Sequence, residues 1–138
     1  MVHIYNGIVI IPLRKRTVSA GYVKDLIGVS YIDDIFNYSK RKNFAVLFLS
    51  YSKGVVFYDT FLDNEVIISN VSDIWCKVVS EQIFRTGVMC NTSNIYLFVK
   101  HSKELDKLPK YLVERGLKVK TPIKGFTDDI IPKLLNFI

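Results

Sequence analysis

Three carboxylates lie close together in a chain that is otherwise basic. Asp59, Asp63 and Glu65 fall within seven positions of one another. The alternation of apolar residues around them predicts two strands, VVFYDTF and EVIIS, joined by a turn at 62–64. Carboxylates that converge from neighbouring strands can hold a divalent ion and activate water against a phosphodiester. One hypothesis is therefore a metal-dependent nuclease that uses Asp59 and Glu65.

The other half of such a nuclease site is missing from the pattern. A lysine should stand two positions after the second carboxylate, so that ammonium and carboxylate meet at the same phosphate. Position 67 is Ile, and EVIIS contains no lysine. A site of the ribonuclease H type would need an aspartate inside the predicted strand at 44–52, which has none. We therefore expect Asp59 and Glu65 to be surface or turn residues, and we expect neither a metal nor a cofactor.

The net charge of +6 is concentrated in two parts of the chain. Residues 1–53 and 100–124 each carry a net +5, whereas residues 54–99 carry −3. Such basic clusters neutralise phosphates in nucleic-acid-binding proteins, although a solvated lysine-rich surface has the same composition. Tyr38 and Tyr51 lie beside lysines and are candidates for stacking on bases. The residues that we expect to contact phosphate are Arg14, Lys15, Arg16, Lys40, Arg41, Lys42, Lys118 and Lys120.

The elements that position these residues mix helices with strands. Periodicity and turn residues predict helices at 19–28, 31–43, 70–89, 109–116 and 126–138. Besides the two strands around the carboxylates, they predict strands at 3–13, 44–52, 95–100 and 117–123. We predict an α/β (α+β) fold in which residues 1–138 form a single domain, with a mixed central sheet and helices on both faces.

The helix at 70–89 has the clearest periodicity, and Asn70 with Asp73 predicts its cap. Its apolar positions are expected to face the core; they are Val71, Ile74, Trp75, Val78, Val79, Ile83, Val88 and Met89. Cys76 and Cys90 lie about 21 Å apart along this helix, which is too far for a disulfide.

The predicted order over residues 31–100 is helix, strand, strand, strand, helix, strand. Restriction-endonuclease-like nucleases share this order, as does the carboxyl-terminal domain of tRNA-splicing endonucleases; without the first helix, a ribonuclease H-like fold also fits. Five stretches resemble the tRNA-splicing endonuclease family: DIFNYSKRKNFAVLF, KGVVFYD, DNEVIIS, KVVSEQIFR and NIYLFVK. The suggestive single positions are Gly54, Tyr58, Val79, Ser80 and Arg85. This resemblance makes 31–100 a nuclease-like core, flanked by extensions at 1–30 and 101–138.

Catalytic members of that family use Tyr, His and Lys without a metal. In the resemblance, Tyr58 takes the tyrosine position and Arg85 falls at or near the lysine position, but the histidine position falls at Asp63–Asn64. Without an imidazole, proton transfer near neutral pH is hard. The resemblance therefore implies a non-catalytic structural subunit, as in two-subunit archaeal enzymes. It would bind a tRNA precursor and brace a catalytic endonuclease subunit in a hetero-oligomer.

A second interpretation stays open, in which the chain is a small basic nucleic-acid-binding protein, for instance a virus-encoded one, with no nuclease ancestry. In either case we expect an oligomer, with the apolar strand at 95–100 offering an edge or face to another chain. No apolar run approaches the roughly 18 residues that span a bilayer. The apolar run near the amino end precedes its basic cluster, the reverse of a secretion signal, so we expect no membrane and a cytoplasmic protein.

Overall fold

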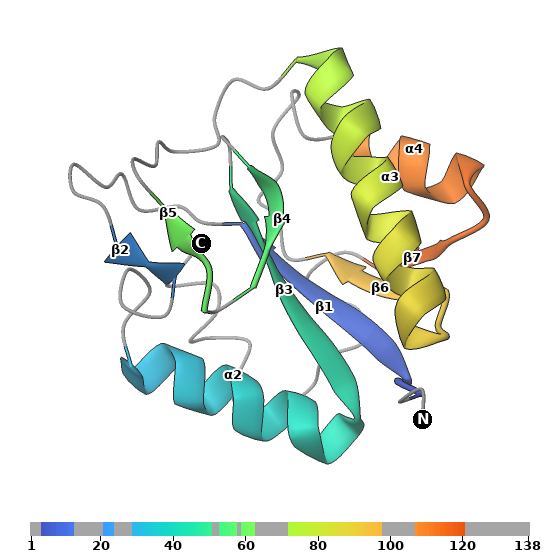
Figure 1. Cartoon of the computed structure of the whole chain (residues 1–138). Coiled ribbons are helices and arrows are strands. Elements are labelled where there is room, and N and C mark those ends of the chain that lie inside the picture. The colour runs from blue at the N-terminus through green and yellow to red at the C-terminus, as the bar shows by residue number, and fades with distance from the viewer. Residues whose placement is uncertain are drawn as a thin grey trace.

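A computed structural model describes residues 4–12, 21–23, 29–50, 53–57, 59–62, 72–97 and 107–120 of the chain. Within these residues the protein has a five-stranded mixed sheet with helices on both faces, which confirms the predicted α/β class (Figure 1). Two further short strands pair with each other beside it. No helix in the described part of the chain is long and apolar enough to cross a membrane.

The elements in chain order are β1 (Gly7–Pro12), β2 (Gly21–Tyr22), α2 (Val29–Lys42), β3 (Phe44–Ser50), β4 (Gly54–Val56), β5 (Phe61–Leu62), α3 (Asp73–Cys90), β6 (Asn94–Leu97), α4 (Lys107–Glu114) and β7 (Lys118–Lys120). The helices predicted at 31–43 and 70–89 are present with ends shifted by a few residues. The helix predicted at 19–28 is wrong at Gly21–Tyr22, which pairs with β5 as a strand. The helix predicted at 126–138 lies outside the described residues.

The middle of the large sheet is β1, in the strand order β4-β3-β1-β6-β7. It pairs in parallel with β3 and with β6, while β4 runs antiparallel at one edge. Residues 1–30 are therefore more than an extension flanking a core at 31–100, because they supply the strand on which the sheet is built. The unbroken apolar run of β1 explains its central position in the sheet, since a strand buried on both faces needs apolar residues at successive positions.

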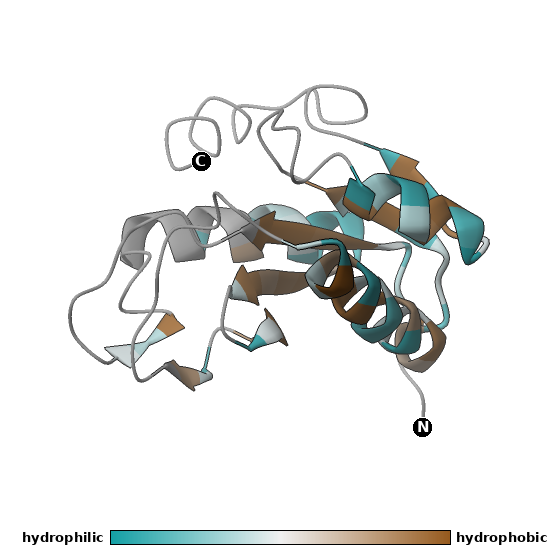
Figure 2. Ribbon diagram, turned by 90° about the horizontal axis from the view of Figure 1, so that it is seen from above, coloured by the Kyte–Doolittle hydropathy of each residue, from teal (hydrophilic) through white to brown (hydrophobic). Residues whose placement is uncertain are grey.

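The core is divided by the sheet. Alternate strand residues, among them Ile8, Leu47 and Ile95, pack with α3 and α4 in one buried cluster. The intervening residues, such as Val9 and Phe48, are equally buried and face the side that α2 covers (Figure 1). Figure 2 shows the resulting hydrophobic strands of the sheet beside helices of mixed character. The strand predicted at 95–100 was expected to offer an edge or a face to another chain; over Asn94–Leu97 it has no free edge, because β6 pairs with β1 and β7.

The buried face of α3 differs from the predicted one. The helix is capped by Ser72, whose hydroxyl accepts the N–H of Trp75 at 3.1 Å, and not by Asn70. Its buried residues are Cys76, Val79, Ser80, Ile83 and Gly87. Four residues expected inside are exposed instead, namely Ile74, Val78, Val88 and Met89. Apolar residues lie on both sides of this helix, and the small residues Ser80 and Gly87 mark the side that packs closely.

A pair of substitutions on α3 tests this orientation. Ile83 is fully buried, so Ile83→Ala should lower the free energy of unfolding by about 2–5 kcal/mol through lost burial and a cavity. Ile74 is 71% exposed, and Ile74→Ala should change it by no more than about 0.5 kcal/mol. Urea unfolding of the two variants measures the difference. A larger loss for Ile74→Ala than for Ile83→Ala would show that α3 is packed by its other face.

Candidate nucleic-acid interface

Three asparagines stand where the parallel strands begin. Asn6 precedes β1, Asn43 precedes β3, and Asn94 is the first residue of β6. Their side-chain amides donate to neighbouring backbone carbonyls: Asn6 to Lys42 at 3.1 Å, Asn43 to Ile4 at 2.9 Å, and Asn94 to Asn6 at 3.0 Å. We call these three residues the asparagine clasp. It fixes the carboxyl end of α2 against the start of β1 and β6.

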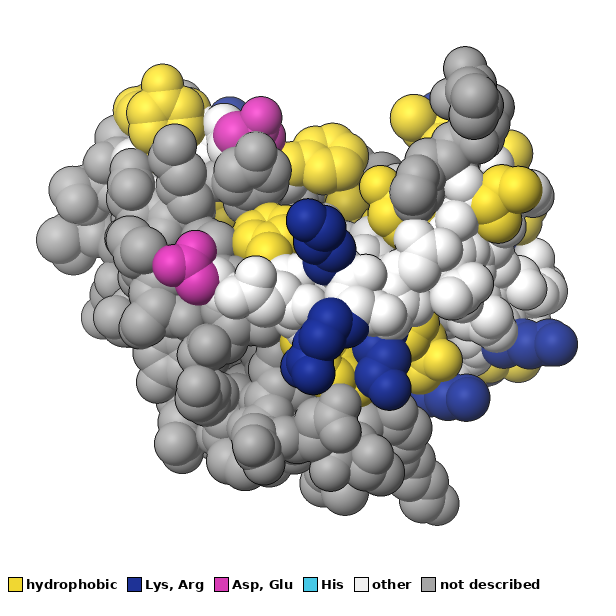
Figure 3. Space-filling model, turned by 90° about the horizontal axis from the view of Figure 1, so that it is seen from below, with side chains coloured by type: hydrophobic (Ala, Val, Ile, Leu, Met, Phe, Trp, Pro, Cys, Tyr) yellow, Lys and Arg dark blue, Asp and Glu magenta, His cyan; other side chains and the backbone are white. Residues whose placement is uncertain are grey.

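Five exposed cations flank the clasp. Lys40, Arg41 and Lys42 form the last turn of α2, and Lys118 and Lys120 lie on β7. The clasp connects the two groups, because Asn6 binds the carbonyl of Lys42 and Asn94 is the sheet partner of Lys118. We call the five cations the basic rim. Figure 3 shows Lys and Arg side chains gathered on the underside of the molecule.

An aromatic pair lies beneath the β7 end of the rim. The Nζ of Lys120 is 5.5 Å from the ring centroid of Tyr96, and this ring lies 4.8 Å from that of Phe44. Gly7 makes room for the tyrosine, because a Cβ there would come within 2.7 Å of the ring of Tyr96. The contact holds Lys120 on the α2 side of the sheet, opposite its neighbour Val119, which packs toward the core.

Tyr38 lies beneath the α2 end of the rim and was predicted to stack on bases. This prediction is wrong, because Tyr38 is only 3% exposed. Arg41 and Lys42 lie 5.6 and 5.9 Å from its ring centroid and cover the ring. Tyr38 therefore packs in the core and supports two cations. The other predicted stacking residue, Tyr51, lies outside the described residues.

The rim cations differ in their partners from three basic residues of α3 and α4. Lys77 and Lys107 pair with Asp73 at 3.4 and 3.6 Å, and Arg85 pairs with Glu81 at 2.9 Å. None of the rim cations forms an ion pair with a carboxylate in the part of the chain that the structure describes.

A simpler interpretation explains part of the rim. Basic residues in the last turn of a helix interact favourably with its dipole, and Lys40–Lys42 occupy that turn in α2. The dipole gives no reason for Lys118 and Lys120, which lie on a strand. The two groups meet on one side of the sheet, as a phosphate-binding surface requires. Arg14, Lys15 and Arg16, also predicted to bind phosphate, lie outside the described residues.

The carboxylate hairpin is not formed as predicted. The strand expected at 55–61 ends at Val56, since the N–H of Thr60 turns back to the carbonyl of Phe57 at 3.1 Å. Asp59 is exposed in this turn, and the described residues hold no group of three metal-ligating side chains. Tyr58 and Glu65, the other residues named for this region, lie outside the described residues.

Arg85 falls at or near the catalytic lysine position in the resemblance, but it does not lie where it could bind a phosphate held at the basic rim. It is exposed on α3 and bound to Glu81 on the next turn of the same helix. Because α3 and α2 cover opposite faces of the sheet, Arg85 does not extend the basic rim. The sequence already placed Arg85 in the acidic stretch at 54–99, apart from the two basic parts of the chain.

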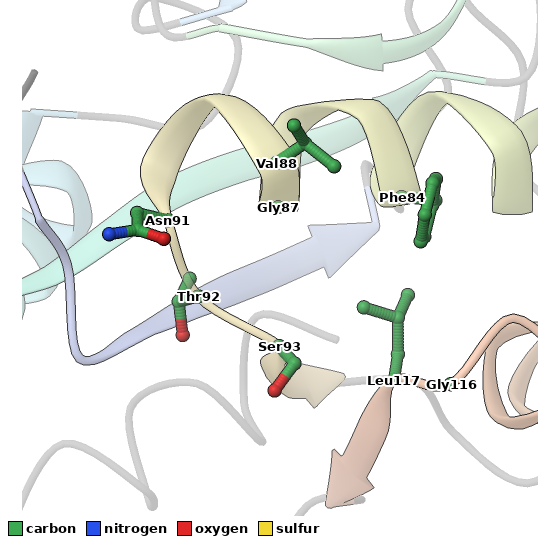
Figure 4. A pocket seen from close by; sticks show the side chains of 8 residues that line it. All are labelled: Phe84, Gly87, Val88, Asn91, Thr92, Ser93, Gly116 and Leu117. Carbon is green, nitrogen blue, oxygen red and sulfur yellow. The ribbon is translucent and has the colours of Figure 1, made fainter.

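A hollow of about 400 Å³ opens at the carboxyl end of α3 (Figure 4). It is lined by Phe84, Gly87, Val88, Asn91, Thr92, Ser93, Gly116 and Leu117. Gly87 allows the turn after α3 to return closely, because a Cβ there would lie 2.9 Å from the carbonyl oxygen of Thr92. None of these described lining residues is charged.

Three described groups with a shifted pKa, Asp73, Cys76 and Tyr111, lie where α3 meets α4, while a fourth, Cys90, is the last residue of α3. The hydroxyl of Tyr111 donates to a carboxylate oxygen of Asp73. This bond lowers the pKa of Asp73, aided by Lys77 and Lys107, and raises the pKa of Tyr111 to about 12. Shifted values can mark functional sites, but here they accompany a link between two helices on the side away from the rim.

Comparisons with known proteins were made at three levels. No protein-family model matches the chain, and no curated protein or solved structure matches it. The interpretation of function therefore depends on the residues and the geometry described above.

The Tyr111–Asp73 link predicts a specific dependence of stability on pH. The pKa of Tyr111 is about 12 in the folded state and about 10 when unfolded, so its contribution is complete below pH 10 and is lost as the pH rises through 12. Tyr111→Phe should be less stable than the parent at pH 7, and the difference should shrink between pH 10 and 12. Thermal unfolding across this range measures both. A difference that is constant with pH would contradict the link.

Proposed function

We propose that the chain is a non-catalytic subunit that binds nucleic acid through the basic rim. In its specific form this is the structural subunit of a tRNA-splicing endonuclease, which positions the RNA and braces a catalytic partner. The observation that carries the proposal is the rim itself: five exposed cations without described ion-pair partners, brought to one side of the sheet from distant parts of the chain. The specific form rests in addition on the sequence resemblance.

The clasp supports this role for the rim. A surface that neutralises phosphates must hold its cations near one another at little cost in free energy, or mutual repulsion would separate them. The backbone at Lys42 is bound by Asn6, and the backbone at Lys118 is paired with β6. Only the flexible side chains then need to be ordered when an RNA backbone binds.

The positions named for catalysis support a subunit without chemistry of its own. The histidine position in the resemblance holds Asp63–Asn64, neither of which transfers protons near neutral pH. Arg85 is neutralised by Glu81 and lies on the other face of the sheet from the rim. A phosphate held at the rim would therefore be remote from Arg85.

The outer face of α3 supports a protein partner. It exposes five large apolar side chains, which are Ile74, Val78, Phe84, Val88 and Met89. The Glu81–Arg85 pair lies between them on the same helix. Exposed apolar residues concentrated on one helix face are typical of a protein contact, and this face points away from the rim, so both surfaces can be occupied together.

The rim predicts the salt dependence of binding. A fluorescent single-stranded RNA should bind with an affinity that falls steeply between about 50 and 200 mM salt, with a log–log slope of about −0.7 per phosphate contacted. The triple variant K40A/R41A/K42A should bind more weakly and reduce the slope by about 2, since each cation lost releases one counterion fewer. Fluorescence anisotropy at several salt concentrations measures both quantities.

The matched control removes three charges from the other side of the molecule. K77A/R85A/K110A lowers the net charge by the same amount but leaves the rim intact. It should keep most of the affinity and the slope of the parent chain. Equal losses in the two triple variants would mean that net charge alone drives binding, which contradicts the proposed interface.

Cleavage assays separate the proposed subunit from the alternatives. Alone, the chain should cleave neither a tRNA precursor nor duplex DNA, with or without Mg²⁺. Cleavage should appear, without need of a metal, when a catalytic endonuclease subunit is added, and D59A/E65A should leave it nearly unchanged. Metal-dependent cleavage by the chain alone that D59A/E65A abolishes would establish the metal nuclease instead. If RNA binds at the rim and no cleavage occurs under any condition, the remaining interpretation is a nucleic-acid-binding protein without a role in cleavage.

A further inference from the structure

The outer edge of β3 is only partly paired. On one side β3 pairs with β1 along its whole length from Phe44 to Leu49, and on the other β4 covers only Phe48–Ser50. The chain then leaves the sheet in the turn after Val56. Among the described residues, no strand pairs with the outer edge of β3 at 44–47. A strand continuing β4 in register would have covered these positions.

The backbone at Val46 faces this open edge. The N–H of Val55 donates to the side chain of Gln82 at 2.9 Å, so Val55 and its partner Leu49 form a non-hydrogen-bonded pair. Pairs of the two kinds alternate along antiparallel strands, so Phe48 points its N–H and C=O toward β4. Val46 lies two residues earlier, so its N–H and C=O point in the same direction as those of Phe48. No described residue binds them, and the side chain of Val46 is only partly buried.

The open edge lies at the bottom of a groove of about 420 Å³. Phe36, Ser39 and Lys40 of α2 line one wall, and Thr86 and Cys90 of α3 line the other, with Phe57 beyond the last residue of β4. Ser39 is 2% exposed, and its hydroxyl has no hydrogen-bond partner among the described residues. A buried hydroxyl without a partner costs free energy, and it marks a place where a ligand could supply an acceptor.

We propose that this groove binds an extended peptide segment of a partner protein, which adds to the sheet as a strand beside β3. The N–H and C=O of Val46 recognise the peptide backbone, and the Ser39 hydroxyl donates to it or to a polar side chain. Phe36 and Phe57 receive an apolar side chain. Lys40, the charged residue of the described lining, favours a carboxylate in the peptide. This inference does not depend on the proposed RNA binding.

The shape of the groove favours a peptide over a second copy of the chain. The open edge is recessed between α2 and α3, so the same edge of another copy, recessed in the same way, could not reach it. A helix satisfies its own backbone groups and would leave those of Val46 unpaired. A single extended segment of about four residues, roughly 13 Å long, matches the uncovered stretch of β3.

The test begins with peptides selected from a phage-displayed library of random 12-residue sequences on the full chain. Selected peptides should alternate apolar with polar residues and include Asp or Glu. Binding of the synthetic peptide should slow hydrogen exchange of the Val46 amide, measured by NMR. Val46→Pro removes the outward N–H, which edge strands tolerate, and should weaken binding by about tenfold or more. Val46→Ala keeps the N–H and should bind within about threefold of the parent.

The proposal can be tested even if Val46→Pro fails to fold. Methylating the peptide nitrogens one at a time should abolish binding at alternate positions only, since successive N–H groups of a strand point in opposite directions. RNA binding at the rim should persist in Val46→Pro when it folds. The proposal is overturned if no selected peptide binds below about 100 µM, if Val46→Pro and Val46→Ala bind equally, or if methylation shows no alternation.

Discussion

The pairing of β1 on both sides is the constraint on which the rest of the structure depends. Because β1 bonds to β3 and β6 in parallel, the starts of all three strands fall at one end of the sheet. The asparagine clasp closes that end, and the last turn of α2 and the strand β7 are carried to it. Basic residues almost eighty positions apart in the chain thus reach one surface. Without β1 between them, neither the clasp nor the rim could form.

Much of the local structure could be predicted from the sequence, because it depends on neighbouring residues. The periodicity over 31–43 and the apolar run at 44–50 identify α2 and β3. The order of strands could not be predicted, because no local pattern says that residues 7–12 lie between β3 and β6. The buried side of α3 was mistaken for a related reason: apolar residues occupy both of its faces, and the side that packs is the one that carries Gly87, where the carbonyl of Thr92 approaches closely.

The candidate site, too, has features that could be predicted from the sequence and features that could not. Charge clustering identified Lys40–Lys42 and the lysines of β7, whereas Arg85 was named only through the resemblance and is bound to Glu81 on α3. What separates them is the presence of a partner and the face of the sheet, and both are properties of the tertiary structure. Tyr38 beside the lysines was expected outside, but a residue on the inner side of an amphipathic helix is buried whatever its neighbours in sequence are.

The sheet divides the protein into two sides with different electrostatics. On the side of α3 and α4 the described charges are largely paired within the chain, around Asp73 and between Glu81 and Arg85. On the side of α2 the rim cations form no ion pair with a described carboxylate, and the groove beside β3 opens next to them. Lys40 belongs to both the rim and the groove. A carboxylate placed there by a peptide would remove one cation from the phosphate-binding surface, so the two ligands would oppose each other through that single charge.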